Sequence, residues 1–341
     1  MTPAPAGAPQ RRDTDPRPPD RAAGAGPGRR PMTAARRANR AGLAFVSPTF
    51  LVVLVVVVLP IAWTVLLAFQ DAKLVDIQNM GLFGNWSLDN FDQVFGSAGF
   101  WSSLGTTLLY TAGATLGSVV LGLATALALR RPFRGRGLLR AAMLLPYVAP
   151  VVAVAFVWEV ALSPQYGVVN DWGRRLFGWD DPIAFLSTRA YETHLLGLRF
   201  DLPMALLTVI AFECWRYFPF AFLFLLARLQ AVPDALEEAA LVDGAAPTQR
   251  FRYVLLPQLM PVVALLCVLR FIMTFNKFDD VYLLTGGGAG TDVAAVRVYD
   301  FLTARYDVGA AAAQSLVLAG SLMVLLGLYF RFFGTKVQEE T

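Results

Sequence analysis

Charged side chains lie inside stretches of this sequence that are otherwise apolar. Glu213 and Arg216 interrupt one such stretch, and Arg270 and Lys277 interrupt another. An ionised side chain at the middle of a bilayer costs about 3 kcal/mol or more unless it meets a partner or water. The chemistry open to these groups is therefore hydrogen bonding to a polar solute, or ion pairing inside the protein.

Both interpretations remain open on the sequence. In the first, a polar pathway for a hydroxylated solute is lined by Glu213, Arg216, Arg270, Asn276, Lys277 and Asp279. In the second, Glu213 and Arg216, three positions apart on one helix face, pair with each other as a structural clasp. Arg270 has no partner within its own segment.

The sequence lacks the motifs of several other chemistries. It contains no Gly-x-x-x-x-Gly-Lys-Ser/Thr motif, so it has no phosphate-binding loop of the Walker type. One His and two Cys do not suggest a metal site, and Cys214 and Cys267 lie in apolar segments, where we expect them to be buried for packing. We therefore expect no catalytic residue, no metal and no cofactor. Any ATP hydrolysis would belong to a separate chain.

The elements that must position these side chains are membrane-spanning helices. Of the 341 residues, 56% are hydrophobic and 16% are charged, whereas soluble domains carry about 25% charged residues. A span needs about 20 mainly apolar residues. Six segments meet that need: 43–69, 105–129, 141–162, 204–226, 258–278 and 308–330. We expect an all-α integral membrane protein with six transmembrane helices.

Glycine and proline mark particular places in these predicted spans. Small residues allow close helix contact in lipid, and the second span carries the glycines Gly105, Gly113, Gly117 and Gly122. Pro60 is expected to kink the first span. Pro146 and Pro150 lie in the first half of the third span.

The distribution of charge predicts the orientation of the chain. Residues 1–40 contain nine Arg and three Asp, and we expect a disordered cytoplasmic tail there. Two roles stay open for it: contact with anionic membrane lipid, and a solvated tail with no specific role, which we favour. Basic residues on short loops mark the cytoplasmic side, and the second predicted span is followed by Arg130, Arg131, Arg134, Arg136 and Arg140. Both termini are thus expected in the cytoplasm of a cell with the chain in its plasma membrane. Because the arginines are concentrated in these segments, the pI of 9.2 does not indicate nucleic-acid binding.

The segment between the fourth and fifth predicted spans has the pattern of two short helices separated by a glycine. Asp234 can cap the first helix, with Glu237 reaching back to it as in a capping box. Gly244 stands where a left-handed residue ends a helix. Pro247 can open the second helix, and Pro257 closes or kinks it.

One face of the first short helix carries small residues. By helical spacing that face contains Leu236, Ala239, Ala240 and Asp243. A shallow face lets another surface approach closely, which suits docking onto a partner. A helical hairpin that only closes a loop is the alternative, and spacing alone does not separate the two.

The sequence Glu238-Ala239-Ala240, followed by Gly244 and later by Leu256-Pro257, resembles the cytoplasmic loop of permeases in binding-protein-dependent ABC importers. Residues 229–233, 270–280 and 284–288 are similar to the sugar-permease branch of that family, which includes maltose- and glycerol-phosphate-type subunits. The resemblance extends over residues 43–333 and is most specific from 228 to 290.

This resemblance implies an ABC importer type I permease fold and a set of partners. The partners are an ATP-binding subunit dimer, a second permease subunit and an extracytoplasmic binding protein that delivers a sugar or polyol. The transmembrane permease domain covers residues 41–333, with a coupling loop at 227–257, and is followed by a cytoplasmic tail at 334–341. The residues implied in ATPase coupling are Glu237, Glu238, Ala239, Ala240, Asp243, Gly244, Ala245 and Pro257. An ATP-independent secondary carrier or channel for a small polar solute is the alternative.

Overall fold

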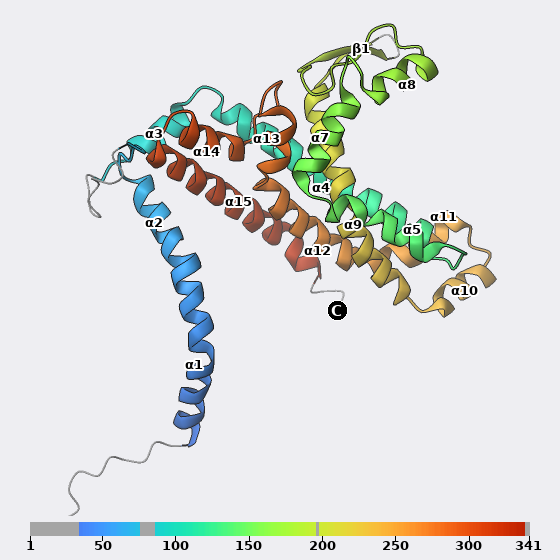
Figure 1. The fold of residues 1–341 in the computed structure, drawn as a ribbon. Coiled ribbons are helices and arrows are strands. Elements are labelled where there is room, and N and C mark those ends of the chain that lie inside the picture. The colour runs from blue at the N-terminus through green and yellow to red at the C-terminus, as the bar shows by residue number, and fades with distance from the viewer. Residues whose placement is uncertain (1–33, 76–85, 196–197, 338–341) are drawn as a thin grey trace, which may run out of the picture. The chain divides into compact units, whose positions relative to one another are not determined.

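The computed structural model describes residues 34–75, 86–195 and 198–337, in two compact units that divide between Leu59 and Pro60 (Figure 1). The first unit holds α1 (Ala34–Val53) and the π-helical turn η1 (Leu54–Val58). Residues 34–40 of the predicted tail lie in α1, whereas residues 1–33 and 338–341 lie outside the described residues.

The second unit is mainly helical. Its helices before the strands are α2 (Leu59–Ala68, of which all but the first residue belong to this unit), α3 (Asp89–Gly96), α4 (Phe100–Leu129), α5 (Arg136–Met143), α6 (Leu145–Val148), α7 (Val151–Leu162) and α8 (Val168–Phe177). After the strands come α9 (Met204–Gln230), α10 (Asp234–Val242), α11 (Pro247–Arg250), the π-helical turn η2 (Phe251–Leu255), α12 (Leu256–Phe275), α13 (Asp279–Thr285), α14 (Ala294–Thr303) and α15 (Val308–Val337).

One small sheet departs from the predicted all-α architecture. Strands β1 (Tyr191–Leu195) and β2 (Leu198–Leu202) form an antiparallel hairpin in which Tyr191 pairs with Leu202. Residues 198–202 read Leu-Arg-Phe-Asp-Leu, and this alternation of apolar and polar residues is the signal of a strand. The helical membrane architecture is otherwise confirmed.

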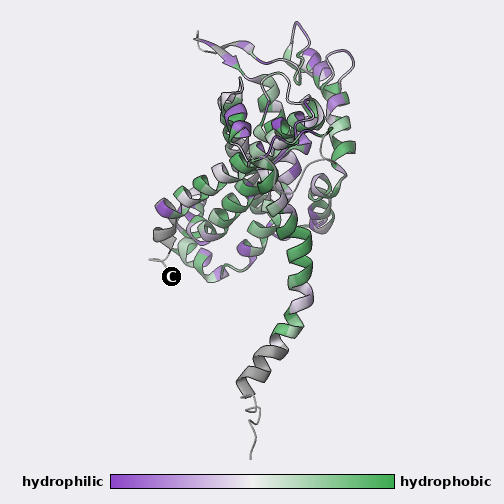
Figure 2. Ribbon diagram, turned by 90° about the vertical axis from the view of Figure 1, so that its left-hand side faces the viewer, coloured by the Kyte–Doolittle hydropathy of each residue, from purple (hydrophilic) through white to green (hydrophobic). Residues whose placement is uncertain are grey.

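Five helices in the described residues are long and apolar enough to cross a membrane. They are Gly42–Ala68, Phe100–Leu129, Met204–Gln230, Pro247–Phe275 and Val308–Arg331. A sixth span is present if the bent pair Arg136–Val148 and Val151–Leu162 counts as one. Figure 2 shows the long helices mainly in the colour of hydrophobic residues, whereas hydrophilic residues gather near the β-hairpin.

The third predicted span is not a straight helix. The two helices of the bent pair meet at 95°, and the bend falls at Pro150. Proline has no N–H to donate, and it disfavours the helical conformation in the residue before it. Ala149 is accordingly extended, with ψ 141°.

Prolines also explain the two π-helical turns. The turn η1 ends two residues before Pro60, and η2 ends two residues before Pro257. In each turn a backbone N–H bonds five residues back, from Leu59 to Leu54 and from Leu256 to Phe251. Each of these turns therefore contains one more residue than an α-helical turn. The wider turn makes room for the proline ring that follows, and the helix does not end. Of the two roles predicted for Pro257, closing the second short helix is wrong, because Pro247–Phe275 forms one continuous span. A kink at Pro257 stays a prediction.

Helices α4 and α9 pack closely against each other at the centre of the second unit. Three of the four glycines of the second predicted span lie at this contact, where a larger side chain would not fit. An added Cβ would stand 3.1 Å from Ile210 at Gly113, 2.2 Å from the Cys214 sulfur at Gly117, and 2.6 Å from Ala221 at Gly122. Gly105 has no such neighbour within 4 Å. Cys214 is buried at this contact, as the sequence predicted.

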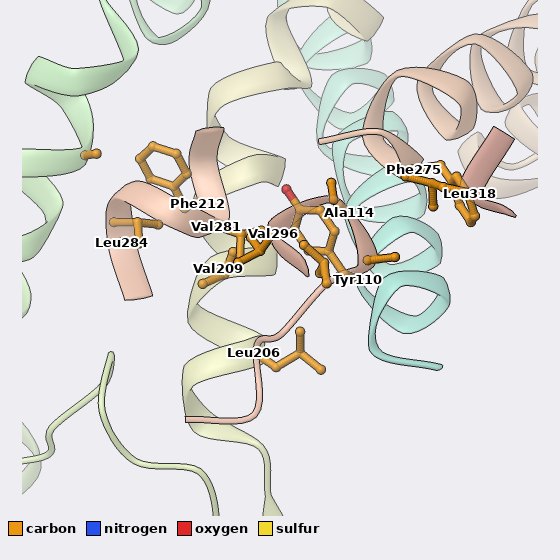
Figure 3. Packing of buried hydrophobic residues seen from close by; sticks show 14 of the residues in the cluster. Tyr110, Ala114, Leu206, Val209, Phe212, Phe275, Val281, Leu284, Val296 and Leu318 are labelled. Carbon is orange, nitrogen blue, oxygen red and sulfur yellow. The ribbon is translucent and has the colours of Figure 1, made fainter. Parts of the chain in front are cut away.

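Figure 3 shows the apolar cluster beside this contact. Tyr110 and Ala114 come from α4, and Phe212 comes from α9. Phe275, Val281 and Val296 bring α12, α13 and α14 into the same cluster. The cluster therefore holds in place the helices that carry the charged side chains.

We predict that Gly122→Ala lowers the free energy of unfolding by about 1–3 kcal/mol, because overpacking forces neighbouring atoms apart. The new Cβ would lie 2.8 Å from the backbone nitrogen of Phe222, which cannot rotate away. Gly105→Ala is the matched control on the same helix and should be neutral or stabilising. Thermal unfolding in detergent measures both variants. Equal melting temperatures for the two would contradict the close contact.

Candidate functional site

The charged residues of the apolar segments form a network where α9, α12 and α13 meet. An Nη of Arg270 on α12 donates to Oε1 of Glu213 on α9 at 2.7 Å, and the two side chains are 1% and 0% exposed. Thr274 donates to the same oxygen at 3.4 Å. The predicted pairing of Glu213 with Arg216 is wrong, because each residue bonds to a different neighbouring helix instead.

Arg216 pairs with a residue that the sequence analysis did not include among the candidates. Its Nη1 donates to Oδ1 of Asp280 on α13 at 2.6 Å, and Lys277 lies 3.6 Å from Oδ2 of the same carboxylate. Burial, together with the neighbouring Glu213, raises the pKa of Asp280 to about 8, and Lys277 and Arg216 oppose that shift. Without these two cations the pKa of Asp280 would be raised further.

One aromatic ring connects the three cations of the network. The hydroxyl of Tyr217 accepts a hydrogen bond from Lys277. The guanidinium carbons of Arg270 and Arg216 lie 4.2 and 5.2 Å from the centre of the Tyr217 ring, within the range of cation–π attraction. Tyr217 directly follows Arg216 and lies four positions, about one helical turn, after Glu213. This spacing is the sequence signal that could have pointed to the role of Tyr217.

The six predicted pathway residues separate into an enclosed group and an accessible group. Glu213, Arg216 and Arg270 are buried. Asn276 is exposed, and the Asp279 and Lys277 side chains are 44% and 15% exposed. Lys277 and Asp279 face each other at 3.4 Å.

Three aromatic rings lie next to the accessible group. The rings of Phe278, Tyr282 and Tyr299 have centroids 4.9 Å apart in each pair. Tyr282 is 37% exposed. Polar side chains beside exposed aromatic rings are suited to hydroxylated rings, which present both hydroxyl groups and apolar faces.

The second candidate site is the hairpin of α10 and α11, residues 233–250. Gly244 has φ +74° and follows the C-cap residue Asp243, so the predicted left-handed end of the helix is confirmed. Pro247 is the first residue of α11, also as predicted. The N–H of Ala246 is bonded by the side chain of Gln249 at 2.8 Å, which fixes the start of α11.

The predicted capping box at the start of α10 is wrong. Pro233 occupies the N-cap position, and no side chain caps the helix there. Asp234 becomes the first residue of the helix, and the carboxylate of Glu237 instead binds the guanidinium of Arg130 at the end of α4. Residues 107 positions apart in the chain thereby meet.

Most of the hairpin surface is exposed. Glu238, Ala239 and Asp243 are exposed, while Ala240 and Ala245 are half-buried. Leu241 and Val242 are 54% and 88% exposed, which is unusual for adjacent apolar side chains on a short surface helix. Pro257, the last of the predicted coupling residues, is exposed in the first turn of α12. Exposed apolar residues beside an acidic rim are typical of a surface that binds a partner.

The sequence relatives of this chain are transport permeases. It is 41% identical over 232 residues to the inner membrane ABC transporter permease protein YcjO of Escherichia coli, a match that covers 68% of this chain and 74% of that protein. It is 32% identical over 304 residues to the trehalose transport system permease protein SugA of Mycobacterium tuberculosis, with 89% and 92% covered.

Solved structures give the same fold. Two crystal structures of a bacterial alginate ABC transporter match with TM-scores of 0.68 and 0.64, at 22% and 21% identity, and each match covers 88% of this chain and 98% of the other. Residues 118–339 match the family described as "Binding-protein-dependent transport system inner membrane component". This chain belongs to that family, and it is a membrane-spanning permease subunit of an ABC importer.

Proposed function

We propose that this permease imports a sugar or polyol, together with a second permease subunit and a separate pair of ATPase subunits. An extracytoplasmic binding protein supplies the solute. Relatives named for trehalose and glycerol-phosphate transport support the class of solute. One of the two alginate transporter structures is a complex with an alginate pentasaccharide-bound periplasmic protein, which supports the mode of delivery.

The observation that carries this proposal is the exposed hairpin. Its left-handed Gly244 separates two short helices, and α10 presents Glu238, Ala239 and Val242 outward. In our proposal this surface inserts into a cleft of an ATPase subunit on the cytoplasmic side. The permease helices have two arrangements, and the ATPase pair makes different contacts with the hairpin in each of them. Closure of the ATPase pair therefore favours one arrangement over the other.

Solute recognition is assigned to the accessible edge of the charge network. Asn276, Lys277 and Asp279 offer an amide, a cation and a carboxylate to hydroxyl groups, and Tyr282 offers a ring face. The enclosed pair of Glu213 and Arg270 then holds α9 against α12 behind this edge. In our proposal both termini lie in the cytoplasm, and the arginine-rich loop after α4 supports this orientation.

Purification of the tagged chain from its native membranes, followed by transport assays in proteoliposomes, tests the proposal. We expect an ATP-binding chain, a second permease and a binding protein either to co-purify with this chain or to be needed for its transport activity. Uptake of labelled trehalose, maltose or glycerol 3-phosphate should need ATP on the side of the membrane where the hairpin lies. Uptake by this chain alone, unchanged by ATP, would favour the carrier or channel instead.

A further inference from the structure

Two adjacent glutamates of α10 have different surroundings. Both carboxylate oxygens of Glu237 accept hydrogen bonds from Nη2 of Arg130, and these two side chains are 19% and 20% exposed. Glu238 is exposed and makes no hydrogen bond or ion pair with the described part of the chain. Glu237 therefore faces into the permease, whereas Glu238 is free to meet another protein.

Arg130 is itself held in a fixed position. It is the C-cap residue of α4, and two later arginines bind the end of that helix. Arg136 donates to the carbonyl oxygen of Arg130 at 3.2 Å, and Arg140 donates to that of Leu129 at 2.8 Å. Cations that bind the last carbonyl groups of a helix stabilise its end. The guanidinium of Arg130 thus extends from an anchored point.

The base of the hairpin has a separate attachment. Arg228, near the end of α9, donates to the backbone and side-chain oxygens of Gln258 at 2.9 and 3.1 Å. This contact joins α9 to α12 on either side of the hairpin. The ion pair of Arg130 and Glu237 adds a link from α10 to the end of α4, and a charged pair with two hydrogen bonds is directional as well as attractive.

We propose that the Arg130–Glu237 ion pair transmits movement of the hairpin to α4, so that Glu237 acts within the permease and Glu238 serves the ATPase surface. This inference rests on the coupling function proposed above. The end of α4 is continuous with the segment that packs on α9 through Gly117 and Gly122. A displacement of α10 therefore reaches, through packed helices, the helix that carries Glu213 and Arg216.

Charge reversal tests the ion pair. Arg130→Glu and Glu237→Arg should each lower the number of sugar molecules imported per ATP hydrolysed at least about tenfold, a coupling loss of about 1.4 kcal/mol. The ATPase should still co-purify with each variant. The double variant restores the attraction with the charges exchanged, and should return the ratio to within about threefold of wild type. Arg131→Glu, at the neighbouring exposed arginine, is the control and should leave the ratio unchanged.

Three outcomes would overturn the inference: single variants with a normal ratio, a double variant without recovery, or single variants that no longer bind the ATPase. The last would place Glu237 in the docking contact. If the reversed variants do not reach the membrane, Arg130→Gln decides the question. A lowered ratio with an unchanged melting temperature supports transmission, and an unchanged ratio rejects it. Absence of ATP-dependent import by the wild-type complex would instead reject the underlying function.

Discussion

A valine at position 244 should lower solute uptake at least about tenfold while the amount of protein in the membrane stays normal. Gly244 has φ +74°, and an added Cβ would meet no atom within 4 Å. The penalty therefore comes from the backbone alone, because a left-handed conformation costs other residues about 1–2 kcal/mol and β-branched residues more. Valine would change the angle between α10 and α11, and with it the surface offered to the ATPase.

Asparagine at the same position is the matched control. It enlarges the side chain but tolerates the left-handed conformation better than other residues do, so Gly244→Asn should keep most of the uptake. The two variants are compared by solute uptake in a strain that lacks its own permease. The amount of each variant in the membrane is measured in the same cells. Normal uptake by the valine variant at normal abundance would reject the coupling role of the hairpin.

The second large effect is expected at the buried ion pair. Arg270→Met removes the partner of Glu213, whose side chain is 0% exposed and whose Oε2 already has no hydrogen bond within the described residues. An uncompensated buried charge costs about 3–5 kcal/mol. We therefore expect a large fall in melting temperature in detergent and a loss of protein from the membrane.

A paired substitution separates this structural role from solute binding. Glu213→Leu with Arg270→Met replaces both charges by apolar groups, and such exchanges are often neutral or stabilising. The double variant should regain most of the melting temperature lost by Arg270→Met. An Arg270→Met variant with normal stability but an altered apparent KM for the solute would instead place Arg270 on the transport pathway.

Local chemistry in the sequence was enough to predict several features. The left-handed Gly244 and the helix start at Pro247 depend on a few neighbouring residues, and both were found as expected. The long apolar segments predicted the membrane spans in the same way. Pro150 and Pro257 show the limit of such local arguments. Both prolines lack a backbone N–H. Pro150 nevertheless lies at a 95° bend, whereas Pro257 follows a π-helical turn in a continuous helix.

Contacts between distant segments could not be predicted from spacing. Glu213 and Arg216 have the right spacing to pair, but Arg270 is 57 positions from Glu213 and Asp280 is 64 positions from Arg216. The packing of α12 and α13 against α9 determines which residues pair with Glu213 and Arg216. Glu237 likewise had a suitable local role in a capping box, and the ion pair with Arg130 across 107 positions replaced it.

The most direct test of the account is the side of the membrane on which the hairpin lies. A single cysteine replaces Val242, which is 88% exposed, in a variant whose Cys214 and Cys267 are changed to serine. A maleimide that cannot cross the bilayer is then applied to intact cells and to inside-out vesicles stripped of peripheral proteins. The account predicts labelling only in the vesicles, with protection when the ATPase subunits are added back. Labelling in intact cells would place the hairpin outside and contradict ATP-driven coupling through it.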